Sequence, residues 1–190
     1  MLNLKKFGTL AIVAFALSAI GAANASAAQF TASATGSFSG KATSNQVFTT
    51  NGGTITCPTA ASSGTISSTA TTQLHETVIY GTCVGPFGVT VHVSPATFLT
   101  TADGVIHLLN QVTMVVTPPF GVPCHITYNP QTWKPVSYTN NGGKLKVTAN
   151  VTAMTYTTTG GFCGSGGANG TLAGTSEIER VGGGSISWDA

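Results

Sequence analysis

Alternation of apolar and polar residues is the strongest pattern in the chain. From Phe30 to Phe38 every second residue is aromatic or small, and the residues between them are Thr or Ser. The same period of two recurs over residues 144–153, with Leu145 and Ala153 at the two ends of the apolar set. A period of two predicts strands with one buried face and one exposed face.

The alternation changes parity after Ala153. Met154 and Tyr156 become the apolar members, and Thr155 and Thr157 become the polar ones. A one-residue change of face inside a long strand predicts a β-bulge or a bend.

The rest of the chain continues this pattern between turns rich in Gly and Asn. The Asp103-Gly104 and Asn141-Gly142 steps predict tight hairpins. No stretch after the N-terminal segment has helical periodicity. The expected fold class is all-β, an antiparallel β-sandwich or bent β-barrel. Further strands are expected at residues 47–57, 73–83, 89–93, 105–117, 124–128, 170–179 and 185–188.

The N-terminal segment has the layout of an export signal. Lys5 and Lys6 precede an apolar run of about 16 residues, and small residues follow. We expect a signal-peptide helix over residues 1–27, cleavage after Ala27 or Ala28, and a single β domain over 28–190. The alternative, a membrane anchor, needs about 20 apolar residues. No later segment is long and apolar enough for a helical membrane span, so a secreted or cell-envelope location is expected.

Removing the signal leaves a chain with almost no net charge. The seven Lys and Arg lose two members, and the remaining five balance the five Asp and Glu. A chain this neutral has no electrostatic footprint for nucleic acid or for an anionic membrane.

Four cysteines remain in the exported part, and none form a C-x-x-C pair. An even number in an exported chain predicts two disulfides and disfavours a thiolate zinc site. Three pairings are possible. We favour Cys57–Cys83 with Cys124–Cys163, because each of these bridges joins neighbouring segments.

One short pattern occurs twice. Residues 86–93 and residues 119–126 share P-F-G-V-x-x-H followed by a β-branched apolar residue. The repeat could mark two equivalent turn-then-strand entries in a pseudo-symmetric sheet, or it could be a coincidence in a sequence of low diversity.

The layout of cysteines and glycine-rich turns resembles a group of small exported actinobacterial proteins that contain disulfides and have no assigned activity. The resemblance rests on residues 55–57, on residues 81–88, on Cys124 at the start of a strand, and on residues 161–164. It implies an exported β fold and transfers no catalytic residue.

The histidines are the candidate metal ligands. His75, His92, His107 and His125 fall within about 50 residues, and strand parity places all four on polar faces. No two have the spacing of a ready chelate. We expect no cofactor and no metal, and His92 with His125 are the first residues to consider if a metal binds.

Catalytic constellations are sparse. Ser165 lies in a Ser-Gly-Gly turn similar to the nucleophile turn of chymotrypsin-like proteases, and Asp103 with a histidine would complete a triad. The residues before Ser165 depart from that family's pattern. Glu177 and Glu179 share a strand face about 7 Å apart, which exceeds the spacing of a retaining glycosidase. We therefore assign no catalytic residue.

Aromatic side chains are the remaining candidates for binding. Trp133, Tyr138 and Tyr128 could stack a carbohydrate if they are exposed, and they could instead pack in the core.

These observations favour an exported, non-catalytic β-domain protein, an interaction or cell-envelope module whose ligand the sequence does not name. Two alternatives stay open. One is an extracellular hydrolase with a histidine and a carboxylate such as Asp103 or Glu76. The other, if the fold is a closed barrel, is a carrier of a small apolar ligand.

Overall fold

The computed structural model describes residues 27–161 and 163–190, and it is almost entirely β-sheet. The predicted export signal lies outside the described residues except for its last residue, Ala27. The elements in chain order are β1 Gln29–Ala32, β2 Gly36–Ala42, β3 Gln46–Thr50, β4 Gly53–Cys57, β5 Ala60–Ile66, β6 Ala70–Thr71, β7 Gln73–Tyr80, β8 Cys83–Val84, the 3₁₀ turn η1 Pro86–Gly88, β9 Thr90–Val93, β10 Ala96–Thr101, β11 Val105–Leu108, β12 Val112–Thr117, β13 Cys124–Tyr128, β14 Gln131–Trp133, β15 Val136–Asn141, β16 Lys144–Gly160, β17 Gly167–Arg180 and β18 Ile186–Asp189.

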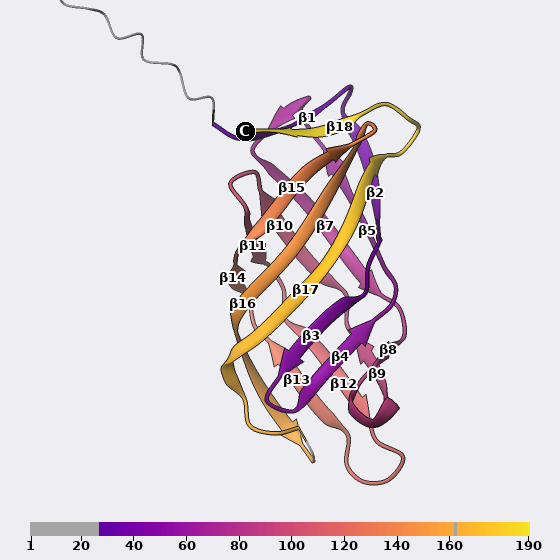
Figure 1. The fold of residues 1–190 in the computed structure, drawn as a ribbon, viewed down its shortest axis with the longest axis vertical. Coiled ribbons are helices and arrows are strands. Elements are labelled where there is room, and N and C mark those ends of the chain that lie inside the picture. Colours follow the sequence, from indigo (N-terminus) through magenta and orange to yellow (C-terminus); the bar gives the residue numbers. More distant parts are fainter. Residues whose placement is uncertain (1–26, 162) are drawn as a thin grey trace, which may run out of the picture.

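The fold is a closed antiparallel barrel, which resolves the choice between sandwich and barrel. Eight strands form a ring in the order β17-β3-β4-β8-β9-β12-β13-β16, and the pairing of β16 with β17 closes it. This ring forms the lower part of the molecule in Figure 1. The upper part continues from the same two long strands, with β2, β5, β7, β10, β11 and β14 added beyond β17 and β15 added beyond β16.

A separate three-stranded sheet, β18-β1-β6, covers the upper end of the barrel (Figure 1). Phe30 and Ile186 from this sheet are buried. The indole Nε1 of Trp188 donates a hydrogen bond of 2.8 Å to the carbonyl of Ala102, and the Trp188 ring lies 5.8 Å from the ring of Tyr138. These contacts plug the upper end with apolar side chains.

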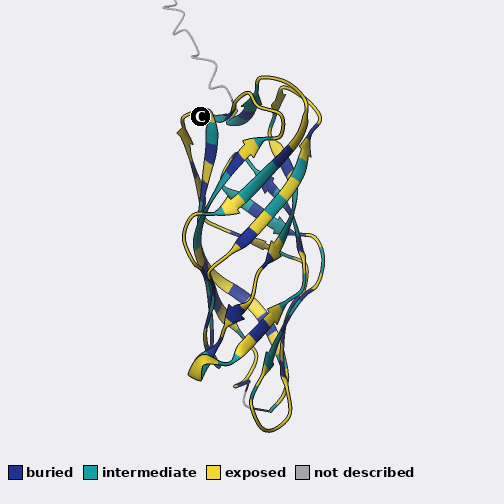
Figure 2. Cartoon of the chain, turned by 90° about the vertical axis from the view of Figure 1, so that its right-hand side faces the viewer, coloured by how far each residue is buried: buried dark blue, intermediate teal, exposed yellow. Residues whose placement is uncertain are grey.

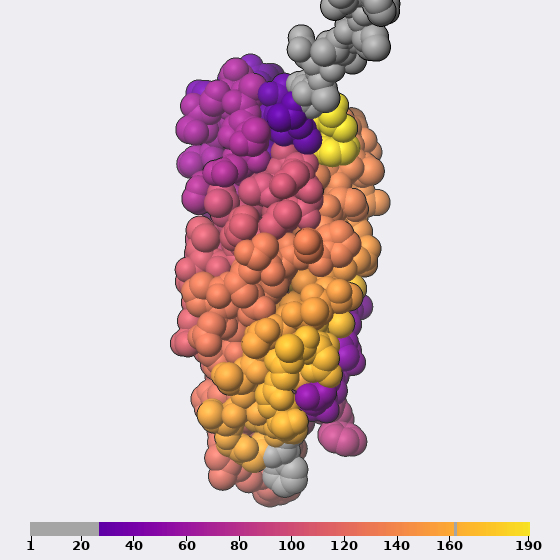
Figure 3. All heavy atoms as spheres, turned by 90° about the vertical axis from the view of Figure 1, so that its left-hand side faces the viewer, coloured from indigo at the N-terminus to yellow at the C-terminus, as the bar shows by residue number. Residues whose placement is uncertain are grey.

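The interior of the barrel is filled by one continuous cluster of buried apolar residues. Figure 2 shows buried and exposed positions alternating along the strands, as the period of two requires. Figure 3 shows the resulting long, narrow body, with successive segments of the chain running obliquely around it. No helix among the described residues has the length and apolarity to cross a membrane.

The predicted change of face in the long strand is confirmed. The pairing of β16 with β17 shifts register between Val151 and Met154, and Ala153 adopts a left-handed backbone with φ 59°. The predicted hairpins at Asp103-Gly104 and Asn141-Gly142 are confirmed as well, because they join β10 to β11 and β15 to β16.

Four predicted strands are divided, and in one of them, expected at residues 73–83, β7 ends at Tyr80 and Cys83 begins β8. The alternation over residues 30–40 continues through a bend at 33–35, which sends β1 to the capping sheet and β2 to the barrel. The expected strand at 47–57 is the β3–β4 hairpin, which turns at Asn51 and Gly52. The expected strand at 105–117 is interrupted at residues 109–111, and β11 and β12 belong to different parts of the barrel.

Both favoured disulfides are present. Cys57 bonds to Cys83 with their Cα atoms 4.1 Å apart, and Cys124 bonds to Cys163 with 5.3 Å between Cα atoms. The first bridge joins β4 to β8 inside the lower ring. The second joins the start of β13 to the connection between β16 and β17.

Candidate functional site

The lower end of the barrel is framed by four connections. They are the β3–β4 turn, the β8–β9 connection with η1, the β12–β13 connection and the β16–β17 connection. Figure 1 places these connections together at the end opposite the capping sheet. Gly53 packs against the ring of Pro86, so the first two connections are in contact at this end.

An apolar cavity of about 350 Å³ opens between these connections. Ile55 and Ile126 form its buried floor, and Val89, Val116 and Pro86 form its half-buried walls. Ligand pockets generally measure about 300–1,000 Å³, so this cavity suits a small molecule.

The cavity offers a ligand little polar chemistry. The Thr50 hydroxyl donates to the carbonyl of Gly53 at 3.3 Å and accepts from the backbone N–H of Gly52 at 3.2 Å, so the turn itself engages this group. No Lys, Arg, Asp, Glu or His belongs to the described lining. With no charged side chain and one hydroxyl already engaged, the described lining offers a polar ligand few hydrogen bonds to offset its desolvation, so the site favours an apolar one.

One wall of the cavity is the β16–β17 connection, and the second disulfide fixes it. Cys124 and Cys163 both line the cavity. Two hydrogen bonds assist the disulfide: the Thr158 hydroxyl donates to the carbonyl of Gly164 at 2.9 Å, and Asn51 Nδ2 donates to the carbonyl of Ser165 at 3.3 Å. The wall is therefore attached to β13, to β16 and to the β3–β4 turn.

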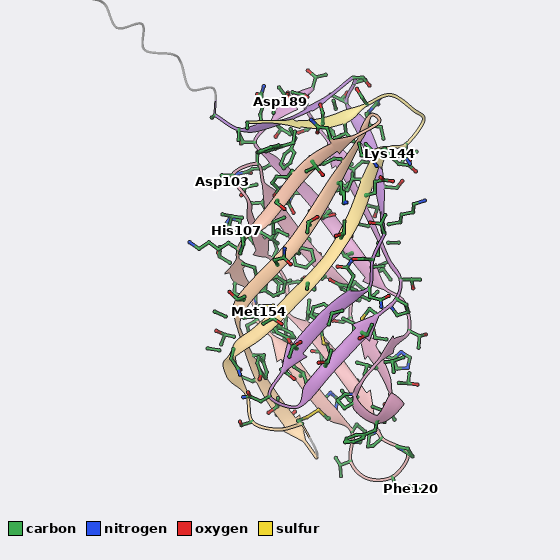
Figure 4. All side chains as sticks on the ribbon, in the orientation of Figure 1. Asp103, His107, Phe120, Lys144, Met154 and Asp189 are labelled. Atoms are coloured by element: carbon green, nitrogen blue, oxygen red, sulfur yellow. A yellow bond between two sulfur atoms is a disulfide. The ribbon has the colours of Figure 1, made fainter. Side chains whose placement is uncertain are left out.

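The rim of the cavity carries two fully exposed phenylalanines. Phe87 has a relative exposure of 104% and Phe120 of 91%, while Val122 on the same connection as Phe120 is also exposed. Figure 4 places Phe120 at the lower extremity of the molecule. Phe87 adopts a left-handed backbone with φ 60° and ψ 21°, which is unfavourable for a residue with a side chain.

The two copies of the repeated P-F-G-V pattern form neighbouring parts of this rim. The first leads into β9 and the second into β13, and these strands pair with the two sides of β12. The first interpretation of the repeat, two equivalent entries into the sheet, therefore fits the structure. The repeat is visible in the sequence, but the cavity that its two copies line arises only when the barrel closes.

The histidines lie in two rows on the outside of the barrel. His92 and His125 both pair in register with Val115, and His75 and His107 both pair in register with Leu99. Two strand spacings separate the members of each row, about 10 Å. No group of three His, Cys, Asp or Glu that could hold a metal ion occurs in the described residues.

The catalytic candidates do not converge. Asp103 lies in the β10–β11 turn near the upper end (Figure 4), whereas Ser165 lies in the β16–β17 connection at the lower end, so a triad containing both is excluded. Glu177 and Glu179 contact Lys144, with Nζ 3.6 Å and 2.6 Å from their carboxylates. These two acids form a surface ion-pair group.

Glu76 faces the barrel interior. Its carboxylate accepts a hydrogen bond of 3.2 Å from the hydroxyl of the buried Thr100, and it lines a second cavity of about 60 Å³ with Trp133 and Phe98. Burial raises the pKa of the Glu76 carboxyl group, and the hydrogen bond from Thr100 opposes that rise only in part. The described part of the chain has no cation paired with this carboxylate.

The three aromatic candidates are buried, so they do not form a surface platform for a sugar. Trp133 is 3% exposed, Tyr138 is 4% exposed and Tyr128 is fully buried. The rings of Tyr128 and Trp133 pack edge to face at 6.1 Å. The alternative of core packing therefore holds for all three, and the exposed aromatics are Phe87 and Phe120, in turns whose exposure the strand pattern does not report.

Comparison of the chain with protein-family models, curated proteins and solved structures found no match.

Proposed function

We propose that this protein is an exported, non-catalytic carrier that holds a small apolar molecule in the cavity at the lower end of its barrel. The observation that carries the proposal is the cavity itself, about 350 Å³ and walled by aliphatic side chains, at the uncapped end of a closed barrel. The two disulfides fit a protein that works in an oxidising compartment.

The chemistry of the lining supports carriage over catalysis. General acid–base and nucleophilic catalysis need ionisable or activated groups at the reacting atoms. The side chains of the described lining supply aliphatic carbon, two phenyl rings, proline rings, a disulfide and one hydroxyl engaged within its own turn.

The experiment is a titration of the mature protein with N-phenyl-1-naphthylamine, an uncharged apolar dye whose emission rises on leaving water. We expect saturable binding of one dye per protein. Val116→Trp places an indole in the cavity and should weaken binding at least tenfold. Val115→Trp is the matched control, because Val115 is the neighbouring residue on β12 and faces the other side of the strand.

Two results would contradict the proposal: no saturable binding by the wild-type protein, or equal dye affinity in the two tryptophan variants. A separate experiment, native mass spectrometry of protein recovered from its export compartment, would identify the natural ligand. An added mass that Val116→Trp abolishes and Val115→Trp retains is the expected finding.

A further inference from the structure

Charged side chains are distributed unevenly over the barrel. The six strands β3, β4, β8, β9, β12 and β13, with the direct connections β3–β4, β8–β9 and β12–β13, contain no Lys, Arg, Asp or Glu. The adjoining residues 147–176 of β16, β17 and their connection contain none either. We call this region, which includes the cavity and its rim, the uncharged half. All ten charged residues after position 28 lie elsewhere, at Lys41, Glu76, Asp103, Lys134, Lys144, Lys146, Glu177, Glu179, Arg180 and Asp189.

At the lower end of the barrel, the uncharged half exposes large apolar side chains of the kind that soluble proteins normally bury. Phe87 and Phe120 project from two separate connections, and Val84 and Val122 are exposed beside them. Both connections hold their backbones firmly. Gly88 N–H donates to the carbonyl of Gly85 at 3.2 Å under Phe87, and three prolines, at 118, 119 and 123, restrict the connection that carries Phe120.

From this arrangement we propose that the uncharged half docks end-on onto an electrically neutral lipid surface, with Phe87 and Phe120 entering the interfacial region. Exposure and the absence of charge are sufficient for docking, whether or not the cavity holds a ligand. Its use, to bring the cavity mouth against the lipid from which an apolar ligand is taken up, rests on the proposed function.

A second copy of the chain fits this end less well. A standard protein interface buries about 800 Å² on each partner. Each aromatic side chain can bury about 150–250 Å², so the two phenylalanines supply only about half of that area. They lie on the neighbouring β8–β9 and β12–β13 connections, which the pairing of β9 with β12 holds side by side. Two apolar side chains of this limited area, without neighbouring charge, suit a fluid lipid interface, which adapts to them.

The charge distribution also determines which lipid surface fits. Attraction to anionic lipid depends on clustered Lys and Arg and decreases with salt. The uncharged half contains neither residue, so docking should be equally strong on neutral and anionic vesicles and insensitive to salt. This distinguishes it from a polybasic membrane contact.

The test is flotation of the mature protein with phosphatidylcholine vesicles, with and without 30% phosphatidylglycerol, at 0.15 M and 1 M NaCl. We expect the protein to float in all four conditions. Phe87→Ser combined with Phe120→Ser should lower the partition coefficient at least tenfold. Leu109→Ser combined with Val181→Ser is the matched control, because it removes two exposed aliphatic side chains outside the uncharged half and should leave flotation unchanged.

A second measurement does not depend on the serine variants. Phe120→Trp keeps an aromatic ring at the tip, and its emission should shift to the blue with neutral vesicles and be quenched by brominated lipid.

Three results would overturn docking: no flotation with neutral vesicles, flotation only with anionic vesicles at low salt, or a vesicle-independent dimer that the double serine variant abolishes. The last result would assign the tip to a second copy. Dye binding is measured without vesicles and flotation without dye, so failure of one proposal is distinguishable from failure of the other.

Discussion

The two disulfides offer a direct test of how stability and ligand binding are connected in this barrel. Cys57–Cys83 closes a separation of 26 residues and Cys124–Cys163 one of 39 residues. In the chain-entropy model, these separations correspond to about 3.5 and 3.9 kcal/mol of unfolding free energy. Replacing each pair by alanine should therefore destabilise the protein to nearly the same extent.

Dye affinity, unlike stability, should differ between the two double-alanine variants. Cys124 and Cys163 line the cavity and attach the β16–β17 connection to β13, whereas Cys57 and Cys83 lie deeper in the ring and outside the cavity lining. Without the second bridge, the described part of that wall loses its covalent link to β13 and keeps non-covalent contacts, such as the hydrogen bonds to Gly164 and Ser165 and the packing of Gly52 against Cys163. Re-ordering it on binding should cost about 1.4 kcal/mol, a tenfold loss of dye affinity.

The assays are urea unfolding followed by tryptophan fluorescence, and dye titration under conditions in which each variant is more than about 95% folded. The comparison is informative because each double variant serves as the control for the other. Equal dye affinities in the two variants would refute the role of the Cys124–Cys163 bridge in holding the cavity wall. A loss of less than about 1 kcal/mol in either variant would refute the loop-closure argument for stability.

Three further substitutions test other parts of the fold. Glu76→Gln should remove a pH dependence. Burial raises the folded-state pKa of Glu76, so the free energy of unfolding is highest below the unfolded pKa of about 4.3, where the carboxyl group is protonated in both states. This stability is lost as the pH rises through the folded-state pKa, and urea midpoints measured from pH 4 to pH 8 in the wild-type protein and the variant would show the loss only in the wild type. Ala153→Gly relieves a left-handed backbone at the bulge and should raise stability by up to about 1 kcal/mol, seen as a higher Tm; an unchanged or lower Tm would contradict this. Gly52→Ala would press its new methyl group against the carbonyl of Cys163, and we expect a loss of about 1–3 kcal/mol in urea unfolding together with weaker dye binding.

Sequence alone predicted many of the strands in which large apolar residues alternate with polar ones, but it missed β10 and also β15, whose Val136 and Tyr138 alternate with polar residues. The bulge at Ala153 was predicted, because the parity of Leu145 through Val151 differs from that of Met154 and Tyr156. Strand β5 escaped prediction because its sequence, Ala-Ala-Ser-Ser-Gly-Thr-Ile, contains one large apolar residue. The structure gives a reason for this composition: the ring of Phe38 lies against Gly64, where a larger side chain would collide with it.

The site was predictable only in pieces. The repeated P-F-G-V pattern and the preferred cysteine pairing both contribute to the cavity, and both could be found in the sequence. Their convergence depends on β16 and β17 closing the ring, a contact between segments that alternation does not specify. For the same reason, strand parity could not separate buried aromatics such as Trp133 from exposed ones such as Phe120.

The segregation of charge shows most clearly what topology adds to sequence. Along the first part of the chain the charged residues are spaced widely, at Lys41, Glu76, Asp103 and Lys134, and the other six lie at residues 144–146, 177–180 and 189. The chain then crosses repeatedly between the two halves of the barrel, and each charged residue falls outside the uncharged half. Solubility alone would favour charges of both signs dispersed over the whole surface. An end that lacks them, and that also carries the exposed phenylalanines and the cavity mouth, is better explained by contact with an apolar phase.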